Sequence, residues 1–127
     1  EDLKHQFHEC IDISSVVIGQ MQSKYKDLER VHFQTMDCMK LSFENESFDA
    51  VFDKGTFDAL MCGPQANEKT RKEVQEIHRV LKPKGRFFLM SYNERDEEIK
   101  TAGEWKSVKV IELENPNIAI DEKQKSV

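Results

Sequence analysis

The stretch "SFDAVFDKGTFDAL", residues 47–60, decides the fold that the sequence predicts. Its apolar residues at 48 and 50–52 have the pattern of a short buried strand, and Asp53 follows where that strand should end. Lys54-Gly55-Thr56 comes next and leads into a second "FDAL" run. An aspartate after a strand commonly caps the next helix or turn, but in an α/β sheet it also stands where ligands bind. The pattern of the rest of the sequence decides between a capping aspartate and a ligand-binding one.

The composition is that of a single globular domain. The chain has 127 residues, 38% of them hydrophobic and 34% charged, and a net charge of -5 argues against a nucleic-acid partner. The basic residues at 69, 71 and 72 are interpreted as a solvated helix face. No apolar run approaches the roughly 20 residues that cross a membrane, and the opening "EDLKHQFHEC" lacks the pattern of a signal peptide. We therefore expect a cytoplasmic protein with no membrane partner.

The cysteines and histidines do not predict a metal site. Cys10, Cys38 and Cys62 are widely spaced and form no CxxC pair, so zinc binding is not expected. Three reduced thiols in an intracellular protein are the preferred interpretation. The four histidines have no metal-ligand spacing in a helix, although His5 and His8 lie three residues apart.

Strands and helices are expected to alternate along the chain. Apolar runs predict strands at 8–13, 31–37 and 47–53, and a stripe at 17, 21, 25 and 28 predicts a helix over 14–29, capped by Ser14 or Ser15. A second helix is expected at 67–81, with Val74, Ile77 and Leu81 on its buried face. This order indicates an α/β fold with a mainly parallel sheet.

The last third of the chain predicts how the sheet is completed. Pro83 should break the second helix and Gly85 should form a turn. Residues 86–92, "RFFLMSY", are continuously apolar and predict a strand buried on both faces. Residues 105–114 alternate as a strand nearer an edge does, with 115–120 as a candidate partner, and 121–127 form a polar tail.

Three aspartates are expected to share one rim of this sheet. Asp12, Asp37 and Asp53 each stand at the carboxyl end of a predicted strand, which is where ligands bind in such sheets. Taken singly, each aspartate is better explained as a cap, but three at one rim favour a ligand site. Asp49 and Asp58 are interpreted as solvent-facing or capping residues.

Three stretches carry a resemblance to a known family: "CIDISSVVIGQM" (10–21), "MDCMKLSFENESFDAVFDKGTFDAL" (36–60) and "EIHRVLKPKGRFFLMSY" (76–92). From residue 1 to about residue 113 the chain resembles the class I S-adenosylmethionine-dependent methyltransferases, with a Rossmann-like sheet. Within them it resembles the group that includes the lysine methyltransferases of translation elongation factor 1-alpha. The resemblance implies S-adenosylmethionine as the cofactor and a protein substrate.

The same resemblance implies which residues hold the cofactor. Asp12, with Ile13 beside it, would hold the ribose hydroxyls. The other members of the implied site are Asp37, Cys38 and Met39 around the adenine, and Asp53, Lys54 and Gly55 at the methionine end. The resemblance identifies no catalytic base, although Asp53 and Tyr92 lie at the expected rim.

One part of the family's pattern is absent from these 127 residues. A glycine-rich loop after a first strand is expected about 20 residues before the acid that holds the ribose, and counting back from Asp12 passes the first residue. We therefore interpret residues 1–120 as a partial methyltransferase domain that lacks the first strand and the glycine loop. This interpretation predicts that the chain as given binds S-adenosylmethionine weakly or not at all.

Three functions remain open from the sequence. The first is transfer of a methyl group to a protein nucleophile, such as a lysine. The second is a non-catalytic methyltransferase-like binding module or inactive fragment. The third, a nucleotide-binding oxidoreductase domain, gives no role to "FDKGTFDAL" or "LKPKG" and ranks last. The sequence leaves the oligomeric state open.

Overall fold

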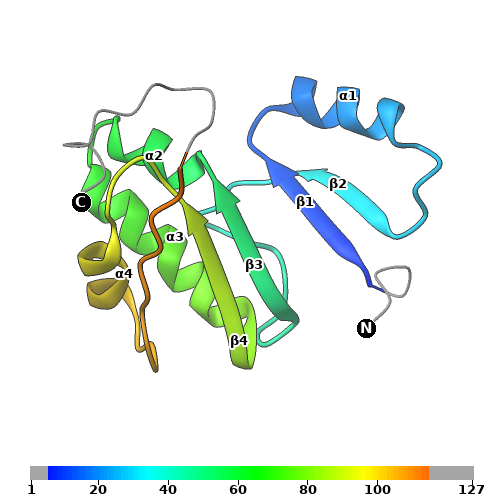
Figure 1. Ribbon diagram of the computed structural model, residues 1–127. Helices are drawn as coiled ribbons and strands as arrows, with labels where there is room; N and C mark the ends of the chain where they lie inside the picture. The colour runs from blue at the N-terminus through cyan, green and yellow to red at the C-terminus, as the bar shows by residue number, and fades with distance from the viewer. Residues whose placement is uncertain (1–5, 115–127) are drawn as a thin grey trace.

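The computed structural model describes residues 6–114, in which strands and helices alternate as the sequence predicts (Figure 1). The elements are, in chain order, β1 (His8–Asp12), α1 (Ser15–Lys24), β2 (Val31–Thr35), β3 (Phe48–Lys54), α2 (Thr56–Met61), α3 (Ala66–Val80), β4 (Leu81–Met90) and α4 (Asp96–Ala102). None of the helices in the described part of the chain is long and apolar enough to cross a membrane.

The four strands form two parallel pairs. β1 pairs with β2, and β3 pairs with β4. All four arrows point the same way in Figure 1, so the carboxyl ends of the strands lie on one side of the molecule. Between residues 6 and 114 no ladder joins β1 to β3. The predicted Rossmann-like parallel α/β arrangement is confirmed.

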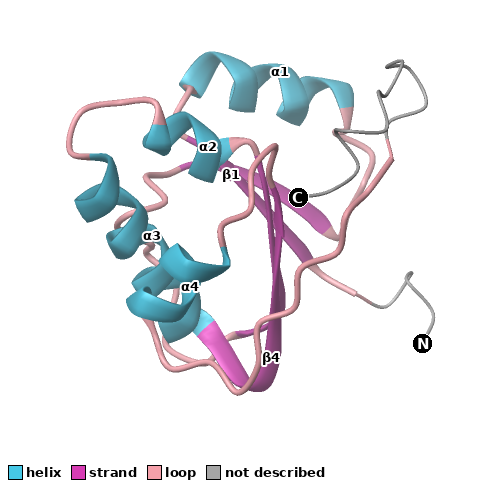
Figure 2. Cartoon of the chain, turned by 60° about the vertical axis from the view of Figure 1, so that its left-hand side comes forward, coloured by secondary structure: helices cyan, strands magenta, loops and turns pink. Residues whose placement is uncertain are grey.

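The hydrophobic core lies between β3–β4 and the helices α2, α3 and α4. Phe57, Val74, Ile99 and Ala102 form its buried centre, and Trp105 packs against it. In Figure 2, α3 and α4 lie together on one side of the strands. The predicted buried face of the second helix is confirmed at Val74 and at Ile77, which is also buried.

The expected course of the first helix is only partly confirmed. The Ser14 hydroxyl accepts a hydrogen bond from the Val17 N–H at 3.3 Å, which confirms Ser14 as the cap. The helix ends at Lys24, however, so the two predicted stripe residues at 25 and 28 lie beyond it. Its buried side chain is Ile18, while Val17 is 38% exposed. The predicted stripe was too long because the helix ends one residue before Tyr25.

The region around β4 departs from several expectations. β4 already begins at Leu81, so this buried residue opens the strand instead of completing α3, and Pro83 lies inside the strand. The residue with left-handed backbone is Lys84, with φ of 68°, and not Gly85. Gly85 is required for a different reason, because a Cβ atom there would lie 2.7 Å from the Lys82 carbonyl oxygen.

Two predictions about the strands are wrong. The strand expected to be buried on both faces is covered on one face only, since Phe88 and Met90 are 45% and 51% exposed. Residues 105–114 form no strand; they pass beside β4 without a ladder in the described residues (Figure 1). Helices α2 and α4 were not predicted. The candidate strand 115–120 and the tail 121–127 lie outside the described residues.

Candidate functional site

The three predicted aspartates share one rim of the molecule. Asp12 is the last residue of β1, Asp37 follows the end of β2 by two residues, and Asp53 is the last residue but one of β3. Because all four strands point the same way (Figure 1), residues at the carboxyl ends of β1, β2 and β3 belong to one rim. The expected common rim is present in the fold, and the role of these residues in holding a ligand stays a prediction.

Asp12 fixes the turn between β1 and α1. Its Oδ1 accepts a hydrogen bond from the Ser14 N–H at 2.8 Å, and Ser14 in turn caps α1. Both Asp12 and Ile13 are exposed, and Ile13 retains 72% of its accessible surface. The carboxylate therefore performs the capping role while it remains open to solvent at the rim.

Asp37, Cys38 and Met39 form a turn at the end of β2. The Met39 N–H donates to Asp37 Oδ1 at 2.9 Å. Burial raises the pKa of the Cys38 thiol to about 12, and the neighbouring carboxyl group of Glu73 is the next largest cause. Asp37 and Asp53 contribute to the same shift. Cys38 is therefore a neutral thiol that lies near acids from three elements, and it is not an activated nucleophile.

Asp53 is the buried member of the rim. It is 8% exposed, and its Oδ1 accepts hydrogen bonds from the Thr56 N–H at 3.1 Å and the Phe57 N–H at 3.4 Å. These bonds cap α2, since the N-cap residue Gly55 has no side chain to do so. Gly55 has φ of 91°, and the space where a Cβ would lie is open, so the backbone here is accessible from the rim. Lys54 is exposed at the end of β3.

The sequence interpretation missed Glu73, which lies on α3 and meets Asp53. Glu73 is 1% exposed. Burial, together with the neighbouring carboxyl group of Asp53, raises the pKa of Glu73 to about 10. One signal was available: position 73 lies one residue before Val74 and four before Ile77, on the helix face that the apolar stripe had already marked as buried.

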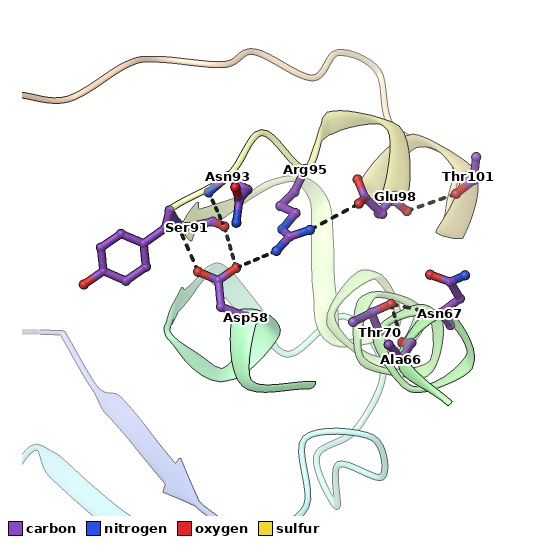
Figure 3. A network of polar contacts seen from close by, with 10 residues as sticks. Asp58, Ala66, Asn67, Thr70, Ser91, Asn93, Arg95, Glu98 and Thr101 are labelled. Carbon is purple, nitrogen blue, oxygen red and sulfur yellow. Dashed lines mark hydrogen bonds and ion pairs between the residues drawn. The ribbon is translucent and has the colours of Figure 1, made fainter. Parts of the chain in front are cut away.

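Asp58 also proved more structural than expected. Its carboxylate accepts hydrogen bonds from the Ser91 hydroxyl at 2.5 Å, the Tyr92 N–H at 3.0 Å and Arg95 Nη2 at 3.4 Å (Figure 3). Burial raises the pKa of Asp58, but these contacts outweigh it and hold that pKa below its usual value. The carboxylate ties α2 to the end of β4, so the solvent-facing alternative is wrong for Asp58. Asp49 does face solvent and pairs with Lys82 at 3.4 Å.

The same network fixes the backbone of Tyr92 at the rim. The Tyr92 side chain is 94% exposed, while its N–H donates to Asp58. A separate cavity of about 200 Å³ lies at the other edge of β4, and its lining includes Ser91, Arg95 and residues 105, 107–111. None of the three rim aspartates lines this cavity. In residues 6–114 no group of three metal-ligating side chains was found.

Fold and rim together define an α/β protein of the kind that binds a ligand beyond the carboxyl ends of parallel strands. The family described as "Methyltransferase domain" matches residues 3–89. The chain belongs to this family, and S-adenosylmethionine is the cofactor that the family membership brings with it. The resemblance recognised in the sequence is thereby confirmed.

The relatives lead to a narrower group. The chain is 37% identical over 89 residues to bovine (Bos taurus) "EEF1A lysine methyltransferase 4", covering 64% of this chain and 35% of that protein. It is 40% identical over 84 residues to Xenopus laevis "eEF1A lysine and N-terminal methyltransferase", covering 64% and 12%. The chain thus spans about a third or less of these relatives.

Solved structures agree with the fold. The PH0226 protein from Pyrococcus horikoshii OT3 matches with a TM-score of 0.56 and 31% identity, over 65% of this chain and 37% of that one. A protein from Methanosarcina mazei, described as a SAM-dependent methyltransferase, matches with a TM-score of 0.54 and 23% identity, over 64% and 40%. The second likeness shows the fold alone.

Proposed function

We propose that this chain is the part of an S-adenosylmethionine-dependent methyltransferase that holds the cofactor and presents it to a protein lysine. The observation that carries the proposal is the common rim of Asp12, Asp37 and Asp53, in a chain that belongs to the methyltransferase-domain family. The strand pattern of the sequence and the geometry of the fold agree on these three acids.

The proposed cofactor contacts follow the resemblance. An exposed carboxylate, as in Asp12, is suited to accept hydrogen bonds from a ribose diol, with Ile13 beside it. The turn at 37–39 offers backbone and carboxylate groups to a purine. Open space at Gly55 lets a polar ligand group approach the backbone near the end of β3. The proposed set is Asp12, Ile13, Asp37, Cys38, Met39, Asp53, Lys54 and Gly55.

The chemistry required of the chain is modest. S-adenosylmethionine supplies a methyl group on a positively charged sulfur when it is bound. The residues at the rim have to orient the donor and the acceptor and exclude water. A lysine acceptor must also lose a proton, which a nearby phenol, carboxylate or water can take. Asp53 and Tyr92 remain the two candidates at the rim, and neither is assigned as the base.

The proposed acceptor is a lysine of a protein of the elongation factor 1-alpha type. The two relatives support this choice, since both are named as methyltransferases that act on lysine in EEF1A. Residues 1–120 as a partial methyltransferase domain, and a cytoplasmic location, stay predictions. A non-catalytic module is the second candidate, because β1 and β3 are not joined by a ladder in the described residues.

Titration calorimetry with S-adenosylmethionine tests the proposed site. Because the chain alone is expected to bind weakly, the measurement uses a chimera in which the part of bovine EEF1A lysine methyltransferase 4 that precedes its matched segment is placed before Glu1. This part is expected to supply the first strand and the glycine loop. We expect the chimera to bind at least tenfold more tightly than the chain alone, since the added loop and strand preorganise the rim.

Two variants of the chimera separate the site from the fold. Asp12→Ala should lose about 1–3 kcal/mol of binding free energy, because it leaves polar ligand groups without a partner. Asp49→Ala, at an exposed acid remote from the rim, should bind normally. Equal affinity of Asp12→Ala and the parent would contradict the ribose assignment. Cofactor binding without methylation of purified elongation factor, followed by mass spectrometry, would favour the module.

A further inference from the structure

The buried contact between Asp53 and Glu73 is a feature that the family resemblance did not anticipate. The geometry points to Glu73 as a positioning residue: its carboxyl group keeps a proton, donates it to Asp53, and thereby holds Asp53 in place beneath the rim. The pair then carries one negative charge instead of two. The relevance of this arrangement to cofactor binding rests on the proposed function, but the arrangement itself does not.

The first argument is burial. Asp53 on β3 and Glu73 on α3 are 8% and 1% exposed, and each has one carboxylate oxygen, Oδ2 and Oε2, that is buried without a partner in the described residues. A buried carboxylate with no hydrogen bond or counter-charge is costly, and two adjacent carboxylates are more so. Two ionised side chains at this position would therefore strongly destabilise the fold.

The second argument concerns the surrounding charges. The titratable group that meets both carboxyl groups is the Cys38 thiol, from the turn after β2, with the Asp37 carboxyl beside it, and neither supplies a positive charge. The remaining way to neutralise the pair is a proton. Burial, with the neighbouring Asp53, raises the pKa of Glu73 to about 10, in agreement with a neutral Glu73 at physiological pH.

One proton satisfies both unpartnered oxygens. A protonated Glu73 has one O–H donor, and Asp53 Oδ2 is an acceptor without another partner. Asp53 would then be held at both ends, with Oδ1 on the Thr56 and Phe57 N–H groups and Oδ2 on Glu73. The consequence is a fixed orientation for the acid at the end of β3, next to the accessible backbone of Gly55.

The pH dependence of unfolding tests the shared proton without any cofactor. In the unfolded chain Glu73 loses its proton above its ordinary pKa, whereas the folded chain keeps it, so raising the pH draws the equilibrium toward the unfolded state. Glu73→Gln mimics the neutral acid and has no proton to lose. Between about pH 5 and 9, we expect the folding constant of the parent to fall relative to that of Glu73→Gln by about tenfold for each pH unit.

Glu76→Gln on the same helix is the matched control. Glu76 pairs with Arg79 at 2.7 Å, and the hydrogen bond from Arg79 lowers its pKa, so its ionised form is the stabilising one. For this variant the dependence should have the opposite sign: the parent gains relative to Glu76→Gln as the pH rises through the acid range. A pH-independent ratio between the parent and Glu73→Gln would overturn the proposal.

Amide exchange tests the positioning role. The N–H groups of Thr56 and Phe57 depend on the orientation of Asp53. We expect both to exchange at least tenfold faster in Glu73→Leu, which cannot donate to Asp53, and at the parental rate in Glu73→Gln. Unchanged exchange in a folded Glu73→Leu variant would show that Asp53 needs no partner and would overturn the positioning role. Failure of cofactor binding in all variants would speak against the proposed function only.

Discussion

The two parallel strand pairs of this chain are alike in geometry but differ in how well they are buried. In the first part, residues 6–47, which contains β1, α1 and β2, the only described hydrophobic side chain that is buried is Ile18. In the second part, residues 48–114, seven hydrophobic side chains are buried, together with Asp53, Thr70 and Glu73. A parallel pair is therefore not a folding unit by itself; the helices that cover it determine whether it has a core.

The difference follows from the number of helices in each part. One helix of ten residues covers β1 and β2, whereas β3 and β4 are covered by α2, the 15-residue α3 and α4. Even in the second part, which has the larger core, helices cover only one face of β3 and β4. Phe52 and Phe88 stack with their ring centroids 4.8 Å apart on the other side, where they are 76% and 45% exposed. An apolar pair exposed in this way agrees with the interpretation of a partial domain.

The largest expected effect comes from emptying the core of the second part. Phe57 is 0% exposed, and Phe57→Ala should cost about 3–5 kcal/mol of the free energy of unfolding, because it removes transfer energy and leaves a cavity. Ile18→Ala, in the first part, should cost about 2 kcal/mol, at the lower end for such changes. Urea unfolding followed by circular dichroism measures both. An equal or larger cost at Ile18 would remove the difference between the parts.

The fold was predicted from the sequence where a pattern is local. The strand patterns at 8–12, 31–35 and 48–54 are short alternations bounded by acids or turns, and they survive in the structure. Burial on both faces could not be predicted for residues 86–92, because it depends on covering helices elsewhere. The alternation at 105–114 lacks a paired strand and so remains a loop. Helices α2 and α4 were missed because they are short, and α4 has only two buried residues, Ile99 and Ala102.

The site, like the fold, was predicted where the signal is local in the sequence. Each rim aspartate follows a strand pattern, so chain position alone was sufficient to place Asp12, Asp37 and Asp53 together. Glu73 and Asp58 act through partners that are distant in the sequence: Glu73 lies 20 residues from Asp53, and Asp58 bonds to Ser91 across 33 residues. A polar residue on a buried helix face was the one local signal for Glu73, and nothing local distinguished Asp58 from a capping residue.

A smaller effect is expected at the connection between the two parts. Arg79 on α3 donates to the carbonyl oxygens of Leu41 and Phe43 at 3.0 and 2.8 Å, so it ties the loop before β3 to the second part. Arg79→Met should cost about 2 kcal/mol, since it leaves these acceptors without their charged donor. Arg79→Lys should recover only part of the loss, because an ammonium group lacks the planar fork of the guanidinium.

The control for this prediction is Lys82→Met. Lys82 forms a single ion pair with Asp49, whose side chain is 89% exposed, and such a surface pair contributes little. The free energy of unfolding should be nearly unchanged. Full recovery by Arg79→Lys, measured by the same urea titration, would show that positive charge alone connects the two parts.

The smallest effect is expected at the cap of α1, where it decides whether the first part folds independently. The Ser14 hydroxyl accepts from the Val17 N–H, and Ser14→Ala removes a cap worth about 1 kcal/mol to the helix. Ser15→Ala, at the next position, is the control, because Ser15 is exposed and is not the capping residue. If the first part opens locally, amide exchange at Val17 and Ile18 should accelerate in Ser14→Ala while the global free energy of unfolding changes by much less than the value of the cap. If instead the global free energy of unfolding falls by the full value of the cap, the two parts unfold together. The loop held by Arg79 then couples the two parts in spite of their unequal burial.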